Sequence, residues 1–81
     1  MRHSDRPQPA LGKAIRQLRE KRGLTQESLG AEAGITERTL SLIESGNANP
    51  KWATVADIAD ALRVSMGQLA KLADKFAAGE K

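Results

Sequence analysis

A short run of hydrogen-bonding side chains near the middle of the chain has the residue types that recognise DNA bases. Arg38 carries a guanidinium that can bridge guanine O6 and N7, and Glu37 can accept a hydrogen bond from cytosine N4. Other roles stay open for both residues. Arg38 could be an exposed surface residue or contact a phosphate, and Glu37 could only stabilise the N-terminus of a helix. Hydroxyls can bond to bases or backbone, and a leucine can meet a thymine methyl. We expect base contacts from Glu37, Arg38, Thr39, Ser41 and Leu42.

The chain lacks the residue types of most catalytic and metal centres. It contains one histidine, His3, which lies on the predicted disordered arm, and it has no cysteine and no metal-ligand spacing. It also has no glycine-rich phosphate-binding loop, and its carboxylates are scattered. We therefore expect a protein that is not an enzyme and that needs no metal, cofactor or small-molecule ligand.

Helix-start signals recur along the chain and define the elements that must position these side chains. Thr25, Thr36 and Ser65 each suit an N-cap, and Ser65 forms an S-x-x-Q capping box with Gln68. Each cap is flanked by two apolar residues in the arrangement of a hydrophobic staple. No segment alternates with a period of two, so we expect no strands. The pattern predicts an all-α fold of five helices, at about residues 10–22, 25–34, 36–46, 52–62 and 65–76.

The stretch 26–45 has the spacing of two short helices joined by a tight turn. Gly34 lies at the turn, which needs a positive φ, and Gly30 lies where the two helices would cross closely. At about 100° per residue, Leu40 and Ile43 of the second helix face inward. Its opposite face then carries Glu37, Arg38, Ser41, Leu42 and Ser45. This pattern predicts a helix-turn-helix, whose second helix commonly enters the DNA major groove.

The composition predicts one small domain with short polar ends. We expect a disordered arm at 1–9, a folded domain at 10–76 and a flexible tail at 77–81. The net charge of +3 is uneven, because residues 13–22 hold five bases and one acid while residues 24–45 hold one base and four acids. The start of the chain has no apolar run typical of a secretory signal, and no stretch approaches the roughly 20 apolar residues of a membrane span. With no cysteine, we expect a cytoplasmic protein.

Three motifs follow one another in order along residues 11–69, about three quarters of the chain: LGKAIRQLREKRGLTQESL, AGITERTLSLIESGNANP and TVADIADALRVSMGQL. With these motifs the chain resembles the Cro/CI-type phage repressor family, also called the xenobiotic-response-element family. One motif alone is moderately specific, and the three together are specific. The resemblance implies a compact five-helix, lambda-repressor-like domain that binds DNA, usually as a dimer.

The resemblance also implies roles for individual residues. Arg19 and Glu44 match a pair that links the first helix to the end of the third and fixes its angle. Leu42 departs from the family, which usually has a polar or basic residue at this position. Leu42 could contact a thymine methyl group or make no contact with DNA, and both alternatives stay open. From its own apolar spacing rather than from the resemblance, Trp52 at the start of the fourth helix is expected in the core. Phosphate contacts are expected from side chains near helix starts and from basic or amide groups, namely Gln26, Thr36, Lys13, Arg16, Asn47, Asn49 and Lys51.

The predicted function is sequence-specific binding of double-stranded DNA by a transcriptional regulator, in particular a repressor. A homodimer would recognise a near-palindromic operator. One face of the last helix, formed by Leu69, Leu72 and Phe76, is the candidate dimer interface, and the alternative is that this face belongs to the core. The alternative is a protein-interaction or antitoxin-type helix-turn-helix module with weak DNA binding, favoured by the acidic centre and by Leu42. RNA binding is a third reading, but the chain has only two aromatic residues for base stacking.

Overall fold

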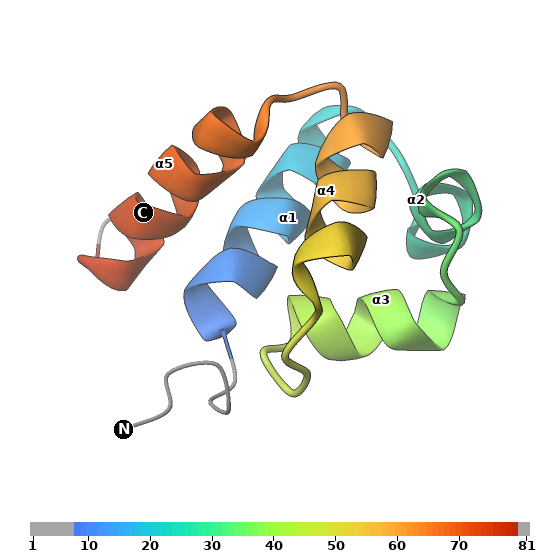
Figure 1. Cartoon of the computed structure of the whole chain (residues 1–81), viewed down its shortest axis with the longest axis horizontal. Helices are drawn as coiled ribbons and strands as arrows, with labels where there is room; N and C mark the ends of the chain where they lie inside the picture. Colours follow the sequence, from blue (N-terminus) through green and yellow to red (C-terminus); the bar gives the residue numbers. More distant parts are fainter. Residues whose placement is uncertain (1–7, 80–81) are drawn as a thin grey trace.

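Five helices form the part of the chain that the structure, a computed structural model, describes, residues 8–79. They are α1 (Pro9–Lys21), α2 (Gln26–Ala33), α3 (Glu37–Glu44), α4 (Trp52–Ala61) and α5 (Met66–Ala77), and no strand occurs within these residues. Figure 1 shows α1 in the centre, α5 along one side of it, α2 on the far side and α3 across one end. α1 packs mainly on α5 and α3, and α2 packs on α3 and α4. The predicted all-α, five-helix, lambda-repressor-like fold is confirmed.

The three predicted N-caps start helices in the structure. The hydroxyl oxygens of Thr25, Thr36 and Ser65 each accept a hydrogen bond of 3.0 Å from the backbone N–H three residues later. Gln68 Oε1 accepts from the Ser65 N–H at 2.7 Å, so the predicted capping box is confirmed. A second box, closed by Ser28, caps α2 and was not foreseen, because serine is not one of the usual residues at that position.

The core lies between the five helices, and its buried side chains are all aliphatic. The seven largest side chains that are less than 2% exposed are Ile15, Leu29, Leu40, Ile43, Ile58, Leu62 and Leu69. The prediction that Leu69 lies on a dimer face is therefore wrong, since its side chain is already covered within one copy. Leu72 and Phe76 are half-buried against the same core.

The prediction that Trp52 lies in the core is also wrong. Its side chain is 73% exposed, whereas Val55 and Ile58 on the same helix are buried. Trp52 continues the apolar spacing of α4, but it is the first residue of that helix. Trp52 instead lines an open hollow beside the first turn of α4. The apolar spacing therefore identified the buried face of α4, but it could not show that Trp52, at the end of that face, stays exposed.

The proposed domain limits fall close to the ends of the described residues. Most of the predicted arm, residues 1–7, and the last two residues of the predicted tail, 80–81, lie outside them. Pro9, the last residue of that arm, is the first residue of α1. No helix between residues 8 and 79 is long and apolar enough to cross a membrane.

Candidate nucleic-acid interface

The turn between α2 and α3 brings the two helices together through two glycines. Gly34 ends α2 with a φ of +78°, which glycine adopts without a steric penalty. A Cβ on Gly30 would lie 2.9 Å from the carbonyl oxygen of Ile35, in the turn that leads into α3. The backbone of the turn therefore approaches α2 so closely that a side chain at position 30 has no room.

The outward face of α3 carries the residues predicted to contact bases. Leu40 and Ile43 are buried, at 0% and 1% exposure. The opposite face is exposed and holds Glu37, Arg38, Ser41, Leu42 and Ser45, with the leucine 37% exposed, and Thr39 is exposed beside it. The phase of α3 therefore places hydrogen-bonding groups on its open side, as its sequence predicts. A shallow hollow of about 360 Å³ separates this face from Gln26 at the start of α2.

Thr36 and Thr39 are tied together at the start of α3. The Thr36 hydroxyl accepts from the Thr39 N–H at 3.0 Å and donates to Thr39 Oγ1 at 2.8 Å. Because Thr39 Oγ1 accepts this bond, its own hydrogen stays free to donate. Thr39 can therefore donate to a base or a phosphate while Thr36 caps the helix.

Glu44, at the end of α3, joins three helices. Its Oε2 accepts from Arg19 Nε at 2.7 Å, and its Oε1 accepts from Arg19 Nη2 at 3.1 Å and from Gln26 Nε2 at 3.0 Å. Arg19 Nη1 also donates to the carbonyl oxygen of Leu24 at 2.8 Å. The side chains of Arg19 and Glu44 are 12% and 3% exposed. The pair expected from the resemblance thus lies in direct contact, with α2 attached to it through Gln26.

The hydrogen bonds of this cluster stabilise the charged form of Arg19. Hydrogen bonding to Glu44 raises the pKa of Arg19 above its ordinary value, and this effect exceeds the lowering caused by burial. Among the described residues, no buried side-chain nitrogen or oxygen lacks a hydrogen-bond partner. The bidentate geometry and the added Gln26 contact satisfy the carboxylate, which is what a buried charge requires.

Gly12, on α1, holds the same end of α3 by close contact. A Cβ there would collide with the carbonyl oxygen of Ile43 and lie 2.7 Å from that of Glu44. Sequence reasoning missed this residue, although a glycine inside a helix signals either close approach or a tolerated cost of about 0.5–1 kcal/mol. It also missed the Gln26–Glu44 contact, for which no local signal exists.

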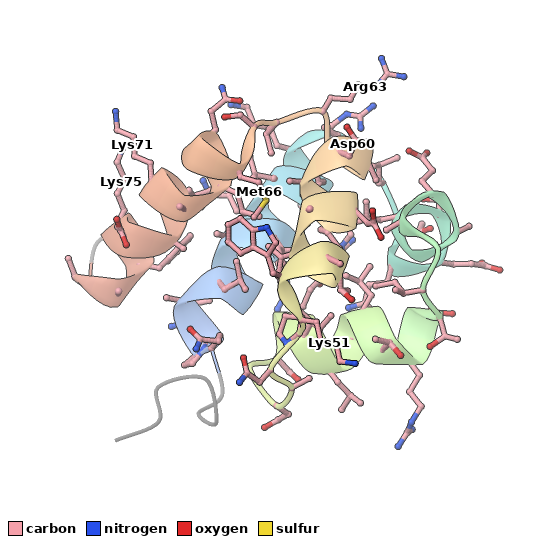
Figure 2. All side chains as sticks on the ribbon, viewed as in Figure 1. Lys51, Asp60, Arg63, Met66, Lys71 and Lys75 are labelled. Carbon is pink, nitrogen blue, oxygen red and sulfur yellow. The ribbon has the colours of Figure 1, made fainter. Side chains whose placement is uncertain are left out.

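The remaining candidate phosphate-contacting residues are exposed. Asn47, Asn49 and Lys51 lie in the loop before α4, and Figure 2 shows Lys51 projecting on the side of the molecule where α3 lies. Lys51 offers no side-chain cap to α4. On α1, Lys13 is exposed, and Arg16 Nε lies 3.1 Å from Glu20 Oε2 in an exposed ion pair.

The structure brings together the start of α2, the outer face of α3 and the loop before α4. A hollow of about 360 Å³ joins Arg16, Gln26, Ser41 and Ser45 on this surface. Gln26 is half-buried, and one of its amide hydrogens is engaged by Glu44, which leaves its other amide hydrogen as a donor. Residues 8–79 contain no group of three histidine, cysteine or acidic side chains able to hold a metal ion.

Comparisons with known proteins agree with this geometry. A family model described as a helix-turn-helix domain matches residues 10–72. The uncharacterized HTH-type transcriptional regulator y4dJ of Sinorhizobium fredii is 35% identical over 71 residues, covering 88% of this chain and 92% of that protein. The restriction-modification controller protein C.AhdI of Aeromonas hydrophila is 28% identical, with a TM-score of 0.74 over 75% of this chain and 92% of that one.

A further structure shares the fold at lower identity. The restriction-modification controller protein C.Esp1396I, solved as a tetramer in complex with its natural 35 base-pair operator, is 24% identical with a TM-score of 0.77. The similarity covers 83% of this chain and 88% of that one. The chain belongs to the helix-turn-helix domain family, among its Cro/CI-type transcriptional regulators.

Proposed function

We propose that this protein is a sequence-specific repressor that inserts α3 into the major groove of double-stranded DNA. The observation that carries the proposal is the exposed polar face of α3 on a helix held at both ends by backbone contacts with Gly30 and Gly12. A helix that must match base edges needs such a fixed orientation, because hydrogen-bond geometry tolerates little displacement. Occupying a promoter would exclude the transcription machinery. The protein acts in the cytoplasm and is not an enzyme.

The proposed interface makes two kinds of contact with DNA. Phosphate contacts position the protein and base contacts specify the sequence. The start of α2, with Gln26, and the loop before α4, with Asn47, Asn49 and Lys51, approach the backbone on either side of the groove. Lys13 and Arg16 of α1 and the capped start of α3 at Thr36 add flanking contacts. Arg38 recognises guanine, while Glu37, Thr39, Ser41 and Leu42 contact neighbouring bases.

Two copies act together on a near-palindromic operator. Two recognition helices about 34–36 Å apart would meet successive turns of the same DNA face. One domain measures 34 × 23 × 19 Å, so two copies at this spacing are close enough to touch. The operator-bound assembly of the controller protein with the same fold supports a multimeric arrangement.

Replacing Arg38 with alanine tests the assignment of the recognition helix. Arg38 is exposed and no described residue pairs with it, so Arg38→Ala leaves the melting temperature unchanged. Loss of its base contact costs about 1–3 kcal/mol per half-site. Both proteins are used to select binding sites from a random duplex library. The unchanged protein yields a near-palindromic motif, and the motif of the variant lacks one guanine preference per half-site. Identical motifs of equal stringency would refute the role of Arg38.

Salt dependence separates DNA binding from the alternative, a protein-interaction or antitoxin-type module. The alternative is motivated by the acidic residues of α2 and α3 and by the exposed Leu42. Lys13, Arg16 and Lys51 give six charged phosphate contacts per dimer, so affinity falls about a thousandfold between about 50 and 200 mM salt. Lys51→Gln removes two of these contacts and flattens the slope of log affinity against log salt by about 1.8. A flat salt response, with partner binding lost in Leu42→Ser, supports the alternative.

A further inference from the structure

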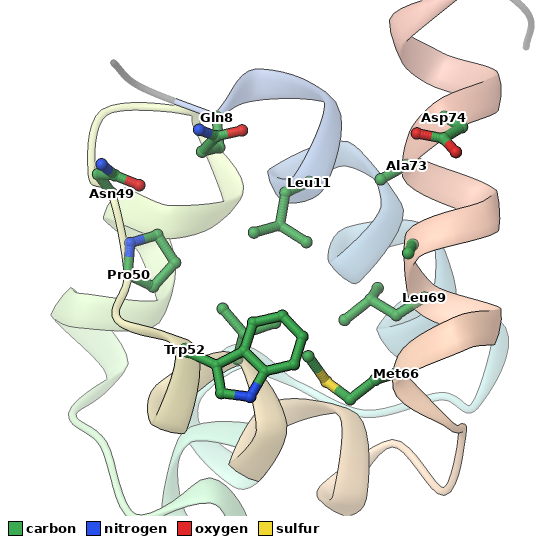
Figure 3. A pocket seen from close by; sticks show the side chains of 11 residues that line it. Gln8, Leu11, Asn49, Pro50, Trp52, Met66, Leu69, Ala73 and Asp74 are labelled. Atoms are coloured by element: carbon green, nitrogen blue, oxygen red, sulfur yellow. The ribbon is translucent and has the colours of Figure 1, made fainter. Parts of the chain in front are cut away.

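Leu42 is an apolar side chain on a face of α3 that is otherwise polar. Of the two large apolar side chains exposed among residues 8–79, Leu42 alone lies on α3, and it is 37% exposed. The other, Trp52, lines the hollow between α4 and α5 (Figure 3). Single exposed leucines are common on protein surfaces, so the exposure of Leu42 alone implies no function. Its position is informative, because this face of α3 is the one proposed to meet base edges.

Leu42 lies one helical turn after Arg38, on the same side of α3. Both side chains line a hollow of about 360 Å³, which they share with Gln26, Glu37 and Ser41. Residues four apart on a helix have Cβ atoms about 5–6 Å apart, and successive bases of one DNA strand lie about 3.4 Å apart. Leu42 is therefore placed to reach a base pair next to the guanine that Arg38 is proposed to bind.

Ser45, which also lies on this face, is engaged in hydrogen bonds within the protein. Its Oγ donates to the carbonyl oxygen of Leu42 at 3.1 Å and accepts from Asn47 Nδ2 at 3.0 Å. A serine hydroxyl has one hydrogen, so Ser45 cannot donate to a base while this bond is made. The N–H of Asn47 donates to the same carbonyl oxygen of Leu42 at 2.9 Å. These bonds fix the backbone of Leu42 at the end of α3 and leave its side chain free to contact DNA.

The major groove presents one kind of apolar group to a leucine, the 5-methyl group of thymine. Cytosine lacks this methyl group, and the purines present the N7 acceptor together with a second polar group. A leucine placed over such a polar group removes its water without supplying a hydrogen bond, which is unfavourable. Leu42 therefore attracts a 5-methyl group and also disfavours bases that lack one, and both effects contribute to specificity.

We propose that Leu42 recognises the 5-methyl group of a pyrimidine in the base pair next to the guanine bound by Arg38. The inference rests on the proposed binding of DNA through α3 and names the chemical group that its second turn recognises. Thymine carries this group, and so does 5-methylcytosine. Ser41 lines the same hollow, and its hydroxyl can donate to O4 of thymine or accept from N4 of 5-methylcytosine. The site therefore accepts both pyrimidines, and methylation of an operator cytosine at this position strengthens binding.

The test removes the methyl group from the duplex and uses the unchanged full chain. Each thymine of the selected site is replaced in turn by deoxyuridine, which lacks only the 5-methyl group, and the dissociation constant is measured at one salt concentration. At one thymine next to the guanine, we expect binding to weaken about fourfold for one half-site and about fifteenfold for both, as for one buried methyl group each. With cytosine at that position instead, 5-methylation of the cytosine strengthens binding by the same factor.

Two variants assign the effect to Leu42. Leu42→Ser removes the apolar side chain, so it binds thymine and deoxyuridine duplexes equally well at that position. Thr39→Ser is the matched control, because it keeps the hydroxyl and removes the methyl group of Thr39, which is also exposed on α3. Whatever its overall affinity, Thr39→Ser keeps the preference for thymine over deoxyuridine. Loss of this preference in Thr39→Ser and its retention in Leu42→Ser would assign the methyl contact to Thr39 instead.

The outcomes separate this inference from the proposed function. A selected motif without thymine next to the guanine that Arg38→Ala loses, or no deoxyuridine penalty at that position, would overturn the role of Leu42 and leave the DNA-binding proposal intact. Both results come from the unchanged protein, so they do not depend on the folding of Leu42→Ser. A library that yields no motif would overturn the proposed function and this inference with it, and would favour a protein partner for the exposed leucine.

Discussion

Arg19→Met lowers the free energy of unfolding by about 3–5 kcal/mol, because it leaves the carboxylate of Glu44 buried without its charged partner. Glu44 is 3% exposed and takes two of its three hydrogen bonds from Arg19. Single domains have total stabilities of about 5–15 kcal/mol, so the loss is a large share of the whole. Denaturant unfolding followed by circular dichroism measures it.

Two variants show whether the burial of Glu44 causes this loss. Arg16→Met makes the same change one turn earlier on α1, where the ion pair with Glu20 is 64% and 54% exposed, and it changes stability little. The double variant Arg19→Met with Glu44→Leu recovers most of the stability, since an apolar pair of similar volume often replaces a buried ion pair at no net cost. It does not recover DNA affinity, because α3 loses its hydrogen bonds to Arg19 of α1 and Gln26 of α2. Equal losses in Arg16→Met and Arg19→Met would contradict the argument.

Gly12→Ala destabilises the protein although alanine is the better helix former. The substitution gains about 0.5–1 kcal/mol of helix propensity, but its methyl group would meet the carbonyl oxygens of Ile43 and Glu44. Both obstacles are backbone atoms, so one helix must move, at a cost of about 1–3 kcal/mol or more. We expect a net loss, and Gly30→Ala repeats the pattern against Ile35. Thermal melting measures both variants.

Gly67→Ala supplies the matched control. Gly67 is exposed on α5, and a Cβ there would meet nothing closer than the Ser65 hydroxyl at 3.7 Å. It should therefore keep or raise the melting temperature. Gly12→Ala should also weaken DNA binding by more than its stability loss accounts for, because α3 has to shift at the end that holds Glu44. A higher melting temperature for Gly12→Ala would show that α1 and α3 are not in close contact at that point.

The sequence alone was sufficient to predict the five helices, the helix-turn-helix and the outward face of α3. These features depend on neighbours within about four residues, such as the caps at Thr25, Thr36 and Ser65, the positive φ of Gly34 and the apolar spacing of α3. The contact between Arg19 and Glu44 needed the family resemblance, because 25 residues separate the two.

The tertiary structure alone decided burial and long-range contact. Leu69 and Trp52 both belong to apolar stripes, yet one is 1% exposed and the other 73%, because α5 packs along α1 whereas Trp52 lines an open hollow. The contacts of Gly12 and Gln26 with α3 likewise depend on how the helices pack. Periodicity fixes the direction in which a side chain points from its own helix, but the packing of other helices determines what it meets.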